Sequence, residues 1–141
     1  MRYLVVGVGN FGKTVAEVLS ANKYEVIAVD SDERRVDDIK DKVSAAFILN
    51  ATDPIALSSL PMGDIDCAIV SIGQCIEHSL RIVAILKNMK VQKLYVRAID
   101  EMHAMILKAM GIDKILYPEE FAGRYLAENL MKGVDDEVKQ E

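Results

Sequence analysis

The sequence predicts an α/β domain in which helices cover both faces of a Rossmann-like, doubly wound parallel sheet of six strands. Two observations support this prediction. Short apolar runs rich in β-branched residues alternate with amphipathic segments along the chain, an order typical of parallel strands joined by right-handed crossovers. The first apolar run also leads without a spacer into the glycine pattern Gly7-Val8-Gly9-Asn10-Phe11-Gly12, which is typical of the first strand-to-helix turn of such a sheet.

In the first half of the chain, apolar runs predict strands at residues 3–6, 25–29 and 45–49. The first helix is expected where apolar side chains recur at the spacing of one helix face, at Phe11, Val15, Val18 and Leu19. A start signal at residues 31–33 opens a second helix, which we expect to run to about Lys42. A short third helix through Leu60 is predicted by Asp53 as N-cap and Pro54 at the first helical position.

The second half of the chain repeats the same alternation. Its apolar runs predict strands at residues 67–70, 93–97 and 114–117. Its helices are expected at residues 76–88, 101–110 and 119–131. We therefore expect residues 1–133 to form a single domain, followed by an acidic, disordered tail at residues 134–141.

Composition narrows the class of protein. The 141 residues suffice for one hydrophobic core, and the net charge of −5 without a basic patch argues against nucleic acid as a partner. No apolar run approaches the roughly 20 residues that span a bilayer, and the first strand follows Met1 directly, so we expect no signal peptide. Cys67 and Cys75 do not form a CxxC motif and are expected to be reduced packing residues. These observations predict a cytoplasmic protein.

The glycine pattern lies between a predicted strand and a predicted helix, which is the context that a dinucleotide-binding fingerprint requires. Gly7 would make the tight turn, Gly9 would let the backbone approach a pyrophosphate, and Gly12 would let helix and strand pack closely. The helix N-terminus offers free N–H groups to phosphates. Asp30 ends the second strand, where a carboxylate accepts hydrogen bonds from ribose hydroxyls. Asp32 is expected to be the N-cap of the helix that follows and also to face the second hydroxyl of the ribose.

Other polar segments follow the carboxyl ends of later strands, at residues 50–53, 71–74 and 97–99. In a doubly wound sheet these ends surround one crevice at the topological switch point. Asn50 and Asp53 fit an adenine-side contact and, equally, a turn and a helix cap. Arg97 ends an apolar strand, and because a buried guanidinium needs an anionic partner, phosphate is a natural one.

Two alternatives remain open from the residues alone. The segment GVGNFGKT, residues 7–14, also matches a phosphate loop, in which Lys13 would reach the phosphates and Thr14 would hold magnesium. A small oxidoreductase, or the NAD-binding half of one, would use the same glycines. No Cys–His pair, Ser–His–Asp triad or HExxH motif emerges, and His78 and His103 fit surface or packing positions on helices. A binding module is therefore favoured over an enzyme.

From Tyr3 to about Leu130, the chain resembles the nucleotide-binding domain of the RCK/KTN family, the cytoplasmic regulators of potassium channels and of Ktr/Trk-type transporters. The resemblance rests on several motifs in order, namely VGVGNFG, AVDSDE, NATD, AIVSIG, VRA and YPEEFAG. It implies a non-enzymatic RCK N-terminal (TrkA-N/KTN) domain that binds ATP, ADP or NAD(H) and gates a membrane pore. It also implies a dimer built into an octameric ring at the inner face of the plasma membrane, with the last helix crossing over to a neighbouring subunit.

The resemblance implies a set of nucleotide-binding residues, which comprises Gly7, Gly9, Asn10, Phe11, Gly12, Asp30, Ser31, Asp32, Asn50, Ala51, Ile72, Gly73, Gln74, Arg97, Ala98, Ile99, His103 and Glu119. Glu119 also resembles a residue that helps hold Mg²⁺ or Ca²⁺ with ATP at the subunit interface. Two features depart from the family pattern. Asn10 stands where related sequences often carry an arginine that reaches phosphates, a charge for which Lys13 would compensate in part. Many relatives also continue into a C-terminal regulatory domain, so we expect this chain to be a fragment or a minimal form.

Overall fold

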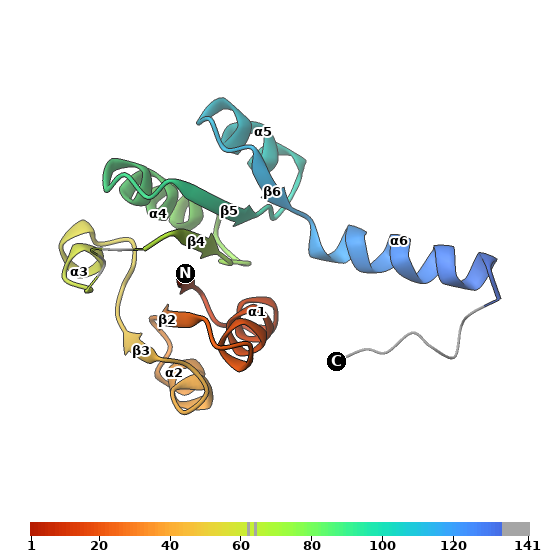
Figure 1. Ribbon diagram of the computed structural model, residues 1–141. Coiled ribbons are helices and arrows are strands. Elements are labelled where there is room, and N and C mark those ends of the chain that lie inside the picture. The colour runs from red at the N-terminus through yellow and green to blue at the C-terminus, as the bar shows by residue number, and fades with distance from the viewer. Residues whose placement is uncertain (62, 64, 134–141) are drawn as a thin grey trace.

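The computed structural model describes residues 1–61, 63 and 65–133. Within them the chain forms a six-stranded sheet in the order β3-β2-β1-β4-β5-β6, and each neighbouring pair is parallel. The strands are β1 (Arg2–Val6), β2 (Glu25–Asp30), β3 (Ala45–Ile48), β4 (Cys67–Val70), β5 (Lys93–Arg97) and β6 (Lys114–Leu116). Figure 1 shows the strands side by side through the centre of the domain. The predicted doubly wound fold is confirmed.

Six helices alternate with these strands in the described part of the chain, namely α1 (Asn10–Ala21), α2 (Glu33–Ile39), α3 (Pro54–Ser58), α4 (Ile76–Asn88), α5 (Glu101–Ala109) and α6 (Pro118–Met131). The cap residues behave as predicted: Asp32 accepts from the N–H of Arg34, and Asp53 accepts from the N–H of Ile55. The expected extension of α2 to Lys42 is wrong. The chain must turn back to pair with β2, and Ser44 already donates its N–H to Val26 in that strand.

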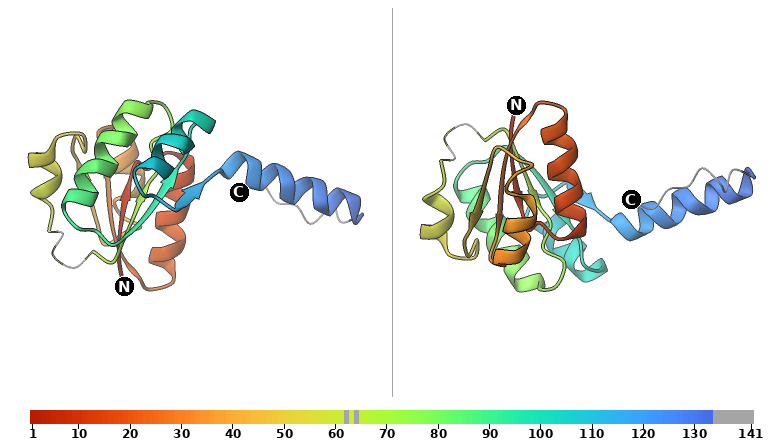
Figure 2. Two further views of the ribbon diagram at one scale, coloured as in Figure 1. Left: turned by 90° about the horizontal axis from the view of Figure 1, so that it is seen from above. Right: turned by 90° about the horizontal axis from the view of Figure 1, so that it is seen from below.

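The sheet separates two apolar cores. Alternate residues of β1 point to opposite faces, so Leu4 and Val6 join the core under α3, α4 and α5, while Val5 joins the core under α1 and α2. Figures 1 and 2 show these two groups of helices on either side of the sheet. Both cysteines are free, and Cys67 is a packing residue of the second core. Burial raises the pKa of its thiol, which favours the uncharged, inert form.

Val18 corrects the predicted inner face of α1. Its side chain is 57% exposed, whereas Gly12 and Ala16 are buried. Residues on a helix are about 100° apart, so Val18 lies roughly opposite Ala16. The small side chains at positions 12 and 16 bring the helix axis close to the sheet, which a purely hydrophobic pattern does not reveal.

The last helix, α6, projects away from the rest of the domain (Figures 1 and 2). It buries none of its residues, and several of its apolar side chains are exposed, among them Phe121 at 76% and Met131 at 79%. Across the described ranges, no helix combines the length and apolar character needed to cross a bilayer. The predicted tail at residues 134–141 lies outside the described residues.

Candidate functional site at the glycine turn

The glycine turn between β1 and α1 is three residues long, because β1 ends at Val6 and α1 begins at Asn10. Gly7 has a φ of 92°, a backbone conformation that side chains with a Cβ rarely adopt. Its N–H donates to the carbonyl of Val29 at 2.9 Å. Gly9 is the N-cap of α1 and makes no side-chain cap bond, so the first N–H groups of the helix face the turn without a capping side chain.

Gly12 allows the helix to meet the turn. A Cβ at this position would lie 1.9 Å from the carbonyl oxygen of Gly7 and 3.2 Å from the Cβ of Ser71. The backbone oxygen cannot move away without unwinding the turn itself, so only glycine fits. This close approach places the N-terminus of α1 directly at the carboxyl ends of β1 and β4.

These elements surround a cleft of about 590 Å³. Its walls come from the glycine turn, the first turn of α1, the segment after β4, the end of β5 and the start of α6, together with one side chain from α2. The lining residues are Gly7, Gly9, Asn10, Phe11, Thr14, Arg35, Ser71, Ile72, Gly73, Gln74, Arg97, Pro118, Glu119 and Ala122. The structure therefore brings together the predicted residues 72–74, Arg97 and Glu119 with those of the glycine turn, except that Gly12 is not among the lining residues.

Asp30 lies behind the glycine turn and is 8% exposed. Its carboxylate accepts two backbone N–H groups, from Val8 to Oδ2 and from Asp32 to Oδ1, each at 2.9 Å. Arg35 approaches Oδ2 at 3.7 Å. Asp30 thus fastens the glycine turn to the start of α2. Ser31 and Asp32 follow it in an exposed turn. Asp30, Ser31 and Asp32 are not among the residues that line the cleft.

Arg97 finds its anionic partner within the chain. Its Nη2 lies 2.5 Å from Oε1 of Glu119, in the first turn of α6. The guanidinium also lies over the ring of Phe11, with Cζ 5.9 Å from the ring centroid, a distance at which a cation is attracted to an aromatic face. The anionic partner of Arg97 in this structure is thus a carboxylate of the same chain, and the expected contact with phosphate stays a prediction.

Ser71 is a cleft residue that the family resemblance does not single out, although the segment 71–74 was expected at the crevice. Its N–H donates to the carbonyl of Val6 at 2.8 Å, which continues the pairing of β1 with β4. Its Oγ is buried and has no hydrogen-bond partner among the described residues. A buried hydroxyl without a partner is unusual.

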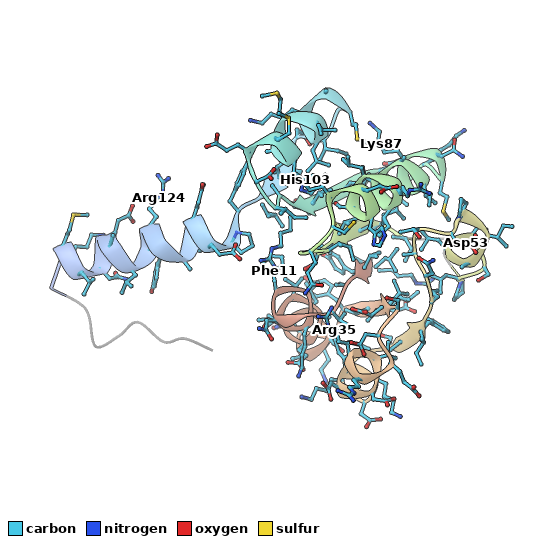
Figure 3. The ribbon with its side chains drawn as sticks, turned by 180° about the vertical axis from the view of Figure 1, so that it is seen from behind. Phe11, Arg35, Asp53, Lys87, His103 and Arg124 are labelled. Carbon is cyan, nitrogen blue, oxygen red and sulfur yellow. The ribbon has the colours of Figure 1, made fainter. Side chains whose placement is uncertain are left out.

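Asn50 and Asp53 form a turn and a cap rather than a wall of the cleft. Asn50 accepts from the N–H and the hydroxyl of Thr52, and Asp53 caps α3. Ala51 packs in the core between the sheet and α3, α4 and α5. Figure 3 shows Asp53 at α3, on the far side of the domain from Phe11.

Ala98 and Ile99 line a neighbouring hollow of about 450 Å³ that shares Gly73, Arg97 and Glu119 with the cleft. His103 lies inside the domain, fully buried on α5 (Figure 3). Its Nδ1 accepts the N–H of Ile99 at 2.9 Å, so the neutral ring carries its proton on Nε2. Burial lowers the pKa of His103. The imidazole therefore supports the turn after β5 and lines neither hollow.

The phosphate-loop alternative does not match this geometry. Lys13 already donates its N–H to the carbonyl of Gly9 within α1, and Thr14 donates its hydroxyl to the carbonyl of Asn10. Residues 10–14 are thus helical, and no long loop remains to cradle phosphates. Within the described ranges, no group of three or more His, Cys, Asp or Glu side chains is arranged to hold a metal ion.

The strand order reverses between β1 and β4, and the cleft lies at that switch point. Fold and site together define a doubly wound α/β domain with a ligand crevice at the carboxyl ends of its strands. The sequence model of the TrkA-N domain matches residues 3–118, and the chain belongs to this family.

One relative agrees with the family assignment, and two solved structures share the fold. The Ktr system potassium uptake protein C of Bacillus subtilis is 33% identical over 129 residues, which are 92% of this chain and 58% of the relative. The chain thus spans less than two thirds of that protein. The TrkA-N domain of the Escherichia coli inner membrane protein ybaL superposes with a TM-score of 0.79 at 19% identity, covering 92% of this chain and 96% of the other. The GsuK channel bound to NAD superposes with a TM-score of 0.74 at 14% identity, covering 89% of this chain and 23% of the GsuK chain.

Proposed function

We propose that this chain is a nucleotide-sensing, non-enzymatic regulatory domain of a potassium channel or transporter. It binds an adenine nucleotide, ATP, ADP or NAD(H), and passes the bound state to a membrane pore. Two findings support the proposal: the Bacillus relative is named as a potassium uptake protein, and the similar GsuK structure is a channel bound to NAD.

The observation that carries the proposal is the cleft at the glycine turn. The bare backbone of Gly7 and Gly9 and the uncapped start of α1 border a space of about 590 Å³, which Ser71 also lines. Nucleotide phosphates suit such a place, because N–H groups and positive helix potential converge on it. The residues present therefore fit the nucleotide.

In this proposal the phosphates lie over Gly9 and the first turn of α1. The ribose lies toward Asp30, whose carboxylate would exchange its contact with Arg35 for ribose hydroxyls. Asn50 and Ala51, at the end of β3, mark the side on which the adenine would lie. Gly73 and the end of β5, with Ala98 and Ile99, enclose the opposite end of the ligand.

Signal transfer would run through α6. Glu119 belongs to this helix and contacts Arg97 in the cleft, so a phosphate that attracts Arg97 weakens the link between sheet and helix. The exposed apolar side chains of α6 suit a second copy of the chain. We propose a dimer in which α6 crosses over to the neighbouring subunit, assembled into an octameric ring at the cytoplasmic face of the membrane beneath its partner.

Glu119 is also proposed as one oxygen ligand of Mg²⁺ or Ca²⁺. The described residues of a single chain do not provide three protein ligands in one place. The remaining ligands would therefore have to come from nucleotide phosphates, water and a second subunit, which are the oxygen donors that these hard cations prefer.

Thermal unfolding of the protein with ATP, ADP, NAD and NADH, each with and without magnesium, tests the proposal when the assembly is sized by light scattering. A ligand at ~100 times its dissociation constant stabilises the native state by about 2.7 kcal/mol. We expect a rise in melting temperature with at least one nucleotide, on a dimer or larger assembly. A monomer that responds to none of the four would overturn the proposal.

A further inference from the structure

Two cationic side chains are among the residues that line the cleft, Arg35 and Arg97. Arg97 is engaged by Glu119 at 2.5 Å and stacked over Phe11. Arg35 is held much less firmly. Its nearest anionic contacts are Asp30 at 3.7 Å and Asp32 at 4.0 Å, both longer than a hydrogen bond. The donors of Arg35 are thus available to a ligand.

The position of Arg35 points to the phosphate side of that ligand. A Cβ built on Gly9 would lie 3.9 Å from both Cζ and Nη1 of Arg35, so the guanidinium is in contact range of the glycine over which a pyrophosphate would pass. The side chain reaches this point from α2 (Figure 3), and its Nη1 lies 3.7 Å from Oδ2 of Asp30, the oxygen that accepts the N–H of Val8 in the glycine turn. It is 45% exposed, so a shift toward a ligand requires no repacking of the core.

The charges around the cleft favour a role for Arg35 in binding phosphate. Asn10, at the mouth of the turn, is neutral, and Lys13 is not among the lining residues. The carboxylate of Asp30 lies directly behind the turn, where it would repel an approaching phosphate. A guanidinium between that carboxylate and the phosphates would offset the repulsion, and its planar fork matches phosphate oxygens.

We propose that Arg35 contacts the 5′-phosphates of the bound nucleotide and supplies the positive charge that position 10 lacks. Its ligand class is an adenosine 5′-diphosphate or triphosphate, or the pyrophosphate of a dinucleotide. The inference rests on the proposed function. An arginine beside this carboxylate also suits the 2′-phosphate of NADP, but the contact with Gly9 favours the 5′ side.

Isothermal titration calorimetry on the whole chain tests this assignment. Wild type, Arg35→Gln, Arg35→Lys and the matched control Arg34→Gln are titrated with adenosine, ADP, NAD and NADP. Arg34 is the exposed neighbour on α2 and does not line the cleft. We expect Arg35→Gln to weaken ADP binding about 10-fold or more, in line with the loss of a charge-assisted contact, and adenosine binding by less than about 2-fold. Arg35→Lys should fall between wild type and Arg35→Gln.

Each of the other outcomes contradicts either the contact of Arg35 with the 5′-phosphates or the proposed function. An equal loss for adenosine and ADP, or a loss as large in Arg34→Gln, would mean that Arg35 does not read the 5′-phosphates. A wild-type preference for NADP over NAD that disappears in Arg35→Gln would move the contact to the 2′-phosphate and overturn the assignment. Wild-type binding that persists unchanged in Arg35→Gln overturns this inference alone. A wild type that binds no adenine nucleotide overturns the proposed function as well. Should Arg35→Gln fail to fold, Arg35→Lys decides the question. A larger loss of affinity for ADP than for adenosine in Arg35→Lys would support the contact, and equal losses would contradict it.

Discussion

Arg97 at the end of β5 donates to Glu119 in the first turn of α6, and this ion pair joins the sheet to the one helix in the described chain that buries none of its residues. The same guanidinium lies over Phe11 at the start of α1. Three elements that are distant in sequence therefore meet at one charged group. Any anion that enters the cleft competes with Glu119 for it.

We expect Glu119→Gln to strengthen the binding of ADP in the presence of EDTA. The substitution releases Arg97 toward the phosphates. Because Glu119 is 75% exposed, the released interaction is worth only about 0.2–1 kcal/mol, which corresponds to a gain in affinity of up to about fivefold. Calorimetry against the neighbouring variant Glu120→Gln provides the comparison. Unchanged or weaker binding in Glu119→Gln would show that Arg97 and the phosphates do not interact.

Gly12→Ala is expected to destabilise the domain by at least about 3 kcal/mol, since its Cβ would collide with the backbone of Gly7 at 1.9 Å and overpacking of this kind forces backbone shifts. Urea unfolding measures the loss. Gly123→Ala is the matched control, because a Cβ there meets nothing within 4 Å and alanine favours a helix. A Gly12→Ala protein as stable as wild type would refute the tight packing of α1 on the turn.

Asp30→Asn should lower the free energy of unfolding by about 1–3 kcal/mol, even without ligand. The carboxylate accepts N–H groups from both Val8 and Asp32, and an amide can accept only one of them, so a buried donor is left unsatisfied. Asp32→Asn is the control, because asparagine is an equally good N-cap. If the two variants proved equally stable, Asp30 would not be fastening the glycine turn.

His103 predicts a pH dependence of stability. Burial lowers the pKa of its imidazole from the model-compound value of 6.5, so the unfolded state binds the proton more readily than the native state. Stability is therefore fully present above pH 6.5 and is lost as the pH falls toward the lower native pKa, with a slope of at most about 1.4 kcal/mol per pH unit. His103→Asn, which keeps an acceptor for the N–H of Ile99, should reduce this slope in urea titrations between pH 7.5 and 5.5. A slope that persists in the variant would assign it to other groups.

Polar substitutions on α6 test the proposed dimer. Phe121→Ser combined with Leu130→Ser removes two exposed apolar side chains, at 76% and 52%, from a helix that buries no residue against its own domain. We expect the assembly to dissociate to monomers in light scattering while far-UV circular dichroism stays the same. A double variant that keeps the wild-type mass would place the interface elsewhere.

Much of the fold follows from local patterns. Strand and helix identities were predictable because periodicity of apolar residues and cap residues such as Asp32 and Asp53 act within a few positions of the chain. Errors arose where tertiary packing intervened. Val18 is exposed because small residues face the sheet, and α2 ends early because the chain must return to pair with β2.

The doubly wound order, the glycine turn and the polar segments at the carboxyl ends of the strands are predictable from the amino-acid sequence, because each depends on neighbouring residues and on a general rule of parallel sheets. Which side chains contact one another in the cleft became known from the three-dimensional packing. It brought Arg35 from α2 over Gly9, paired Arg97 with Glu119, buried His103 under the turn after β5 and left Asn50 and Asp53 outside the cleft. These contacts depend on how separate helices and strands pack against one another, and no local pattern in the chain encodes the distances between their side chains.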